Sequence, residues 1–220
     1  MFSYIFMKIF ESSPRNYDRL MQKASLGRIK AIKASVATEL SDQKRVLEIG
    51  CGTGELAAMM VANGANVDAF DVNPEMIKVA RQRISSNHPE NHFTLRMMGV
   101  EGMDGLADST YDAVVSVLVF SELSDDERRF ALKHAFRVLT PGGLMVIADE
   151  VMPRNLFRKV LYLITRMPML MMTYLISRST TQPIYDLPGE LIHAGFIIEK
   201  ENRSHGDAFS LVIGRRVREK

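Results

Sequence analysis

The chain has 220 residues, of which 46% are hydrophobic and 25% are charged, and its formal net charge is only +2. This length and composition suffice for one sizeable core, so we expect a single α/β domain over residues 1–220. The near-neutral charge gives no reason to expect a nucleic-acid partner. The single cysteine, Cys51, excludes an internal disulfide and suits a reducing compartment. Residues 1–10 lack the charged start and cleavage site of a secretory signal, so the expected location is the cytoplasm.

Four consecutive segments are expected along the chain. They are an N-terminal helical segment, an alternation of strands and helices, an apolar insertion, and a closing helix with a hairpin, over residues 1–43, 44–150, 151–185 and 186–220. Apolar runs predict strands at 46–49, 66–71, 92–97, 111–120 and 144–149, and a final pair at 196–201 and 208–214. Helical spacing and capping residues predict helices at 55–63, from 74 onward, and from 124 to 139.

A glycine-rich loop follows the first strand. Gly50, Gly52 and Gly54 stand at alternate positions directly after an apolar run and before an amphipathic one. Glycine permits positive φ and close approach of the backbone to a ligand, and the N–H groups at the next helix start face that ligand. The pattern therefore predicts a loop that wraps a small molecule. Within it, Cys51 is interpreted as a small space-filling residue and not as a nucleophile.

The spacing of the loop separates two classes of ligand. The dinucleotide fingerprint requires glycine five residues after Gly50, where this chain has Glu55. Glu48 places a carboxylate at the end of the strand, where it would repel a diphosphate and attract a cation. The ligand is therefore expected to carry positive charge.

These residues resemble motif I of the class I methyltransferases, which use S-adenosylmethionine, a donor that carries an ammonium and a sulfonium group. Asp71 ends the next strand about twenty residues later, the spacing at which a carboxylate reaches a ribose. The resemblance implies that Asp71 holds the ribose hydroxyls and that Val72 lies against the adenine. Taken alone, Asp71 would be an ordinary acid before a helix that Asn73 caps. We add Met76, in that helix, to the predicted donor-binding residues.

The resemblance extends over residues 44–149 and favours the branch typified by the ubiquinone and menaquinone biosynthesis methyltransferases. It implies a Rossmann-like, doubly wound α/β fold with seven strands, mostly parallel, and a C-terminal antiparallel hairpin. One departure concerns the adenine. That branch usually has Gly-Asp-Ala after the third strand, whereas this chain has Gly99, Val100 and Glu101. Either Glu101 bonds the adenine amino group or backbone groups around Val100 do.

The methyl acceptor is harder to identify, because methyl transfer needs in-line positioning and does not always need a base. Ser121 and Glu122 follow the fourth strand and are candidate catalytic residues, although Glu122 can also be interpreted as a solvated residue near a helix start. Asp149, with the acid after it, ends the fifth strand and is open to the same two interpretations. The Asn/Asp-Pro-Pro-Tyr/Phe motif of enzymes that methylate nucleic-acid amines is not found there. A nucleic-acid acceptor is therefore disfavoured.

Two further candidates lie outside the sheet, and no metal site is expected. In related small-molecule methyltransferases a tyrosine from an N-terminal helix closes over the donor, and Tyr17 stands at that position; it equally reads as an interface residue. His205, in the predicted hairpin loop, is a weaker catalytic candidate. Of the five histidines, only His88 and His92 approach metal-ligand spacing, and they flank Pro89 in a loop.

The insertion at residues 151–185 is rich in leucine and methionine and carries several basic residues. Arg166 and Pro168 interrupt it, so a membrane-spanning helix is not expected. Three interpretations stay open: a helical cap over the acceptor site, a helical pair that buries a dimer interface, or a basic amphipathic element lying on a membrane. The third would make the protein peripheral to a membrane.

A narrower resemblance is to the methyltransferases associated with corrinoid proteins in anaerobic microbes. It rests on residues 3–8, 14–18, 26–28, 119–124 and 148–151. It implies a corrinoid or a corrinoid protein as acceptor and partner. The acceptors that stay open are therefore a soluble small molecule, a corrinoid, and a membrane quinone or lipid. The alternative to an enzyme is a scaffold or sensor that binds the donor without turnover and partners a corrinoid protein.

Overall fold

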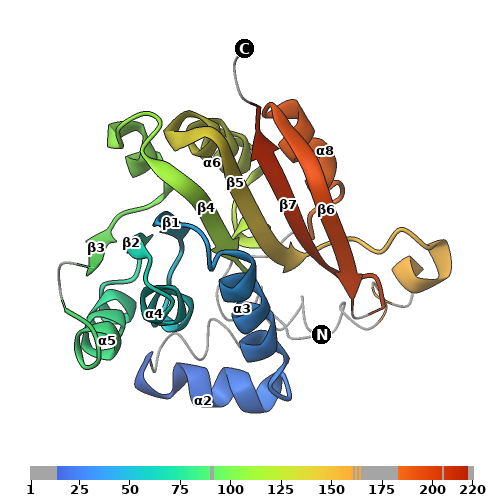
Figure 1. Ribbon diagram of the computed structural model, residues 1–220. Helices are drawn as coiled ribbons and strands as arrows, with labels where there is room; N and C mark the ends of the chain where they lie inside the picture. The colour runs from blue at the N-terminus through green and yellow to red at the C-terminus, as the bar shows by residue number, and fades with distance from the viewer. Residues whose placement is uncertain are drawn as a thin grey trace.

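The computed structural model describes residues 14–89, 92–160, 162, 164, 183–204 and 206–217. Within them, seven strands form one sheet in the order β3-β2-β1-β4-β5-β7-β6 (Figure 1). The strands are β1 (Arg45–Ile49), β2 (Asn66–Asp71), β3 (Phe93–Met97), β4 (Tyr111–Val117), β5 (Leu139–Glu150), β6 (Phe196–Ser204) and β7 (Phe209–Arg216). The first five strands run parallel, and β7 is antiparallel to both β5 and β6. The predicted α/β class, strand number and antiparallel hairpin are confirmed.

Helices cover both faces of this sheet. One face carries α3 (Arg28–Glu39), α4 (Glu55–Ala62) and α5 (Pro74–Ser85), whereas α6 (Asp125–Val138) and α8 (Leu187–His193) pack on the other. Successive strand residues alternate between the two faces: Val46 packs with the first set of helices and Leu47 with the second. The helix α2 (Pro14–Ala24) contacts α3 and α5 below the sheet in Figure 1.

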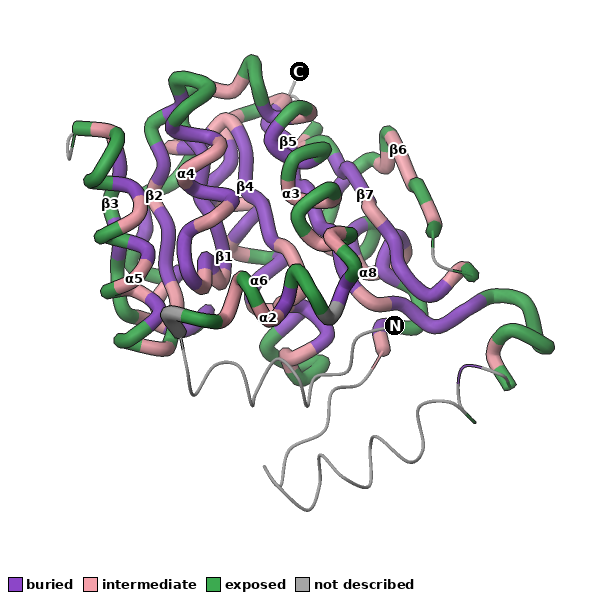
Figure 2. Tube along the Cα trace, turned by 90° about the horizontal axis from the view of Figure 1, so that it is seen from below, coloured by how far each residue is buried: buried purple, intermediate pink, exposed green. Residues whose placement is uncertain are grey.

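Burial is greatest in the middle of the sheet. Residues Ala113, Val114 and Val115 of β4 are fully buried, as expected for a central parallel strand covered on both faces. The edge strand β6 alternates between exposed and half-buried residues along most of its length, as Figure 2 shows. The central strands therefore form a rigid base from which the connecting loops project.

Several local predictions are confirmed by the helix ends. The side chain of Asn73 accepts hydrogen bonds from the backbone of Glu75 and Met76, so it caps α5 as predicted. Ser124 and Glu127 form the predicted capping box of α6.

The predicted extent of the fourth strand, to residue 120, is wrong. The strand ends at Val117 because Leu118 adopts a positive φ of 61°, after which the short 3₁₀ helix η3 (Phe120–Glu122) turns toward α6. A second 3₁₀ helix, η2 (Val100–Gly105), follows β3 and was not expected. Both segments lie beside the carboxyl ends of parallel strands.

The insertion is described only in part. Val151 forms an isolated bridge with Ile184, and residues 156–160, 162 and 164 are helical. The rest of the predicted cap, including the methionines at 167–172, lies outside the described residues, as does His205. In the part of the chain that the structure describes, no helix is both long and apolar enough to cross a membrane.

Candidate functional site

A cavity of about 350 Å³ opens at the carboxyl ends of β1, β2 and β4. This is the edge at which open α/β sheets bind ligands. The cavity brings together most of the predicted donor-binding residues, namely Glu48, Gly50, Cys51, Gly52, Asp71, Val72, Met76, Val100 and Glu101. Gly54 is the one predicted donor-binding residue that does not line it. Tyr17 and Glu122 line the cavity as well, whereas Ser121 does not.

The glycines serve the loop in different ways, although each has a positive φ. A Cβ on Gly50 would overlap the side chain of Val119, and a Cβ on Gly54 would lie 2.7 Å from the Cβ of Ala80. These two glycines allow the loop to pack against its neighbours. Around the Cβ position of Gly52 there is open space, so this residue leaves room in the cavity. The loop between β1 and α4 is thus shaped for close packing on two sides and for a ligand on the third.

Asp71 is fixed by the backbone around it. One carboxylate oxygen accepts a hydrogen bond of 2.8 Å from the Gly52 amide, and the other accepts one of 2.9 Å from the Asn73 amide. The side chain is half-buried and lines the cavity. Because each carboxylate oxygen has a second lone pair, Asp71 can still accept bonds from a pair of hydroxyl groups. The predicted ribose site is therefore already oriented.

Glu48 lies deeper in the same cavity and is only 3% exposed. Burial raises the pKa of its carboxyl group to about 8, against the opposing influence of Lys33 and with a further rise from Asp71. Its carboxyl group accepts a hydrogen bond from the Ala57 amide in the first turn of α4, but its Oε2 atom has no hydrogen-bond partner. A buried oxygen without a partner is costly, so this atom is the strongest indication of a cationic ligand.

Cys51 is also buried, but nothing about its thiol suggests a reactive role. Burial raises the pKa of its thiol, and the carboxyl groups of Glu48 and Asp71 raise it further. The thiol is thus held in its neutral form, which agrees with the interpretation of Cys51 as a space-filling residue.

The expected adenine end of the cavity is formed by residues after β2 and β3. Val72 is 71% exposed, an unusual exposure for a valine, and borders the cavity. Met76 is buried at the start of α5, and Val100 is buried in η2. A Cβ on Gly99 would overlap the carboxyl group of Glu101, so the Glu101 side chain folds back over Gly99 at the cavity wall. These positions suit the predicted roles, which stay predictions.

The helix α2 forms a further wall and is tied to the glycine loop. The Thr53 hydroxyl donates a 2.6 Å hydrogen bond to Asp18, and Arg83 of α5 donates to Thr53 and pairs with Asp18. Tyr17, the neighbour of Asp18, lines the cavity from this helix. Sequence reasoning found Tyr17 but missed this cluster, because residues 18, 53 and 83 are far apart in the chain and share no motif.

On the acceptor side, the strand-end acid Asp149 is not presented to the cavity. It is fully buried and accepts hydrogen bonds from the Ser121 amide at 3.1 Å and the Glu150 amide at 2.7 Å. Burial raises the pKa of Asp149, while these bonds and one from the Ser121 hydroxyl lower it. Ser121 is likewise buried and turned to Asp149. Glu122 is therefore the one residue of this group that borders the cavity.

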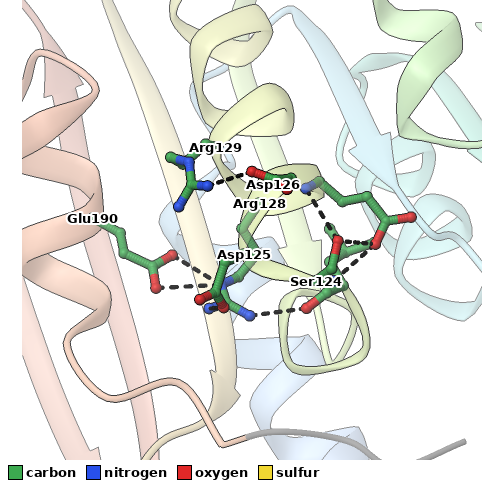
Figure 3. A network of polar contacts seen from close by, with 8 residues as sticks. Ser124, Asp125, Asp126, Arg128, Arg129 and Glu190 are labelled. Carbon is green, nitrogen blue, oxygen red and sulfur yellow. Dashed lines mark hydrogen bonds and ion pairs between the residues drawn. The ribbon is translucent and has the colours of Figure 1, made fainter.

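A polar network next to Glu122 joins α6 to α8 (Figure 3). Its centre is Arg128, whose side chain is 8% exposed and contacts both carboxylate oxygens of Glu190, at 3.0 and 3.2 Å. Arg128 also donates to the Leu123 carbonyl at 2.8 Å and to Asp125 at 2.5 Å. Because Leu123 lines the cavity, Arg128 fixes this part of the wall against α8. No sequence motif pointed to Arg128.

Among the residues that the structure describes, no three His, Cys, Asp or Glu side chains are grouped so as to hold a metal ion. The residues present fit a different ligand. Glu48 offers an unpartnered oxygen to a cation, Asp71 offers free lone pairs to a diol, and the open space at Gly52 admits a ligand close to the backbone. S-adenosylmethionine has a matching ammonium group and ribose.

Comparison with known proteins supports this match. Residues 46–143 match a family described as a methyltransferase domain. This stretch of the chain, which includes the glycine loop and Asp71, is therefore similar to a methyltransferase domain. Its relatives include a demethylmenaquinone methyltransferase of Chlorobaculum parvum, 31% identical over 71% of this chain and 64% of the relative. A demethylmenaquinone methyltransferase of Thermus thermophilus is 34% identical over 63% of this chain and 62% of the relative. The chain thus spans less than two thirds of the length of these relatives.

Solved structures agree with the methyltransferase domain at the level of the fold. An O-methyltransferase family protein from Burkholderia thailandensis superposes with a TM-score of 0.71 at 19% identity, covering 96% of this chain and 62% of that protein. An S-adenosylmethionine-dependent methyltransferase from Methanosarcina mazei gives 0.60 at 19% identity, covering 81% and 94%. The resemblance to the methyltransferase class and to its quinone-biosynthesis branch is confirmed. The corrinoid partnership stays a prediction.

Proposed function

We propose that this chain transfers the methyl group of S-adenosylmethionine to a small, largely apolar acceptor of the quinone type. The observation that supports S-adenosylmethionine as the donor is the cavity that Glu48, Asp71 and the glycine loop line together. When bound, the donor would supply a sulfonium methyl group to a nucleophilic atom of the acceptor: the bond to the methyl carbon forms as the carbon–sulfur bond breaks, S-adenosylhomocysteine leaves, and the methylated acceptor releases a proton. Glu48, Gly52 and Asp71 bind and orient the donor, so that the reacting atoms are held in line.

The acceptor is inferred from the opposite wall. Leu118, Val119 and Leu123 give this wall an apolar character, and Glu122 and Glu127 are the acidic residues that line it. Leu118 holds its positive φ there through a 2.9 Å hydrogen bond from its amide to the Ala148 carbonyl. Backbone in a rare conformation at a cavity wall is often retained for function. The relatives named demethylmenaquinone methyltransferases support an aromatic acceptor of quinone type.

The volume of the cavity supports an acceptor that enters only in part. About 350 Å³ is near the lower limit for a site that holds one drug-sized ligand. With the donor in place, an acceptor would extend its reacting ring past Glu122 and Leu123 and leave the rest outside. A quinone with a long tail could enter in this partial way, and so could a corrinoid that is bound to its own protein. The test therefore includes the predicted corrinoid acceptor.

The test uses methyl-labelled S-adenosylmethionine with a soluble naphthoquinol that lacks the ring methyl group, with reduced cobalamin, and with fractions of host extract. Label on the naphthoquinol, or on a quinone from the extract, supports the proposal. Label confined to the corrinoid would replace the quinone with the acceptor implied by the resemblance to corrinoid-associated methyltransferases. Donor binding without labelled product in any arm would favour the non-catalytic scaffold. Asp71→Ala serves as the control for transfer that depends on the site.

A further inference from the structure

A lysine beside Glu48 has no role in the site described so far. Lys33 projects from α3 into the cavity, its side chain is only 15% exposed, and its Nζ lies 3.0 Å from a carboxylate oxygen of Glu55. Among the described cavity residues, the only other cation is Lys30, which is exposed. A lysine is rarely buried to this extent without a charged partner.

Lys33 and Glu48 place a cation and a titratable acid at one end of the cavity. The ammonium group of Lys33 is close enough to act on the charge of Glu48, and the Oε2 atom of Glu48 has no partner. The other acids that line the cavity, among them Asp71, Glu101 and Glu122, would repel a ligand carboxylate. A ligand with adjacent ammonium and carboxylate groups would therefore be oriented in one way only.

We propose that Lys33 binds the carboxylate at the amino-acid end of the donor, while Glu48 binds the ammonium group beside it. This inference rests on the proposed function only in taking S-adenosylmethionine as the donor. Lys33 would then change partners on binding, from Glu55 to the ligand. Glu55 tolerates this loss because it is the first residue of α4, where the helix dipole favours negative charge.

The change of partner from Glu55 to the ligand allows a binding role of Lys33 to be distinguished from a structural one. If the Lys33–Glu55 pair only stabilised α3 against α4, removing either partner would have the same effect. If Lys33 binds the donor, Glu55 competes with the ligand for it. Removing Glu55 then preserves or strengthens binding, whereas removing Lys33 weakens it.

The test is calorimetry with two probes, S-adenosylhomocysteine and 5′-methylthioadenosine, which keeps the adenosine and sulfur but lacks the amino-acid end. Lys33→Met is expected to weaken S-adenosylhomocysteine binding by about 10- to 100-fold, because a charge-assisted bond is lost. Binding of 5′-methylthioadenosine is expected to change by less than about twofold. Glu55→Gln is expected to bind S-adenosylhomocysteine as tightly as the wild type or more tightly, and Lys33→Arg to recover part of the loss.

Lys200→Met is the matched control, because it removes a second lysine that pairs with an acid of α3, Glu39, away from the cavity. It should leave both affinities unchanged. Equal weakening of the two probes by Lys33→Met, or equal weakening of S-adenosylhomocysteine by Lys33→Met and Glu55→Gln, would overturn the proposal. Failure of the wild type to bind either probe would overturn the proposed function itself, which is a distinguishable result.

Discussion

Two aspartates at the carboxyl ends of different parallel strands of the sheet behave differently. Asp71 ends β2, is half-buried and borders the cavity, whereas Asp149 near the end of β5 is fully buried away from it. Each accepts hydrogen bonds from at least two backbone amides. The difference lies in what surrounds the remaining lone pairs: a cavity at Asp71, and packed protein with the Ser121 hydroxyl at Asp149.

An acid at the carboxyl end of a parallel strand is therefore not by itself a ligand site. On the β1–β2 side the acids keep capacity for a ligand, because the glycine loop leaves space beside them. On the β4–β5 side Asp149 is used to hold η3 against β5. Substitutions on the two sides should therefore separate binding from stability.

Asp149→Ala is expected to give the largest effect, a loss of about 3–5 kcal/mol in the free energy of unfolding. The reason is that the buried amides of Ser121 and Glu150 and the Ser121 hydroxyl would each lose a partner. Chemical denaturation measures the loss. The matched control is Asp112→Ala, which removes an acid that also accepts two amides, from Lys44 and Arg45, but near the surface, and which should cost about 1 kcal/mol. Equal losses would contradict the distinction.

Arg128→Met should cost about 2–3 kcal/mol, because it leaves Glu190 and the Leu123 carbonyl without their buried partner. Its neighbour Arg129 pairs with Asp126 in solvent, with 69% and 91% of the two side chains exposed. Arg129→Met should therefore change the stability by less than about 0.5 kcal/mol. Thermal unfolding of the two variants tests the network in Figure 3, and similar melting temperatures would argue against it.

Asp71→Ala should instead reduce affinity for the donor. Loss of charge-assisted hydrogen bonds to the ribose is expected to cost roughly 1.5–3 kcal/mol, or about 10- to 100-fold in the dissociation constant. Calorimetry with S-adenosylhomocysteine measures this, and Asp149→Asn is the control that should bind within about threefold of the wild type. A folded Asp71→Ala variant with unchanged affinity would place the ribose contact elsewhere.

The sequence predicted most of the donor side because local rules operate there. Alternate glycines after an apolar run, and an asparagine and proline before a helix, constrain the backbone within a few residues. The acceptor side depended on contacts between distant residues. Nothing near Asp149 in the sequence indicates that Ser121 donates a hydrogen bond to its carboxylate. Nothing near Leu118 predicts its positive φ, which comes from packing between β4 and β5. Lys33 was missed because a lysine within a helix ordinarily faces solvent.

The last expected effect concerns the dependence of donor binding on pH. In the folded chain the pKa of Glu48 is about 8, against 4.5 for an exposed glutamate. Between these values the folded chain holds a proton that the unfolded chain has released, so the free energy of unfolding falls as the pH rises toward about 8. A ligand ammonium group favours the charged carboxylate. Below about pH 8, donor binding must therefore release this proton.

It follows that the affinity for S-adenosylhomocysteine should rise with pH between about 6 and 8, by at most about tenfold per pH unit. Calorimetry in two buffers of different ionisation enthalpy measures the released proton directly. Glu48→Gln keeps the shape of the side chain but cannot titrate, so its affinity should be lower at pH 8 and independent of pH over this range. A wild-type affinity that stays constant from pH 6 to 8 would mean that Glu48 is charged before the donor arrives, with Lys33 and not the ligand as its counter-ion.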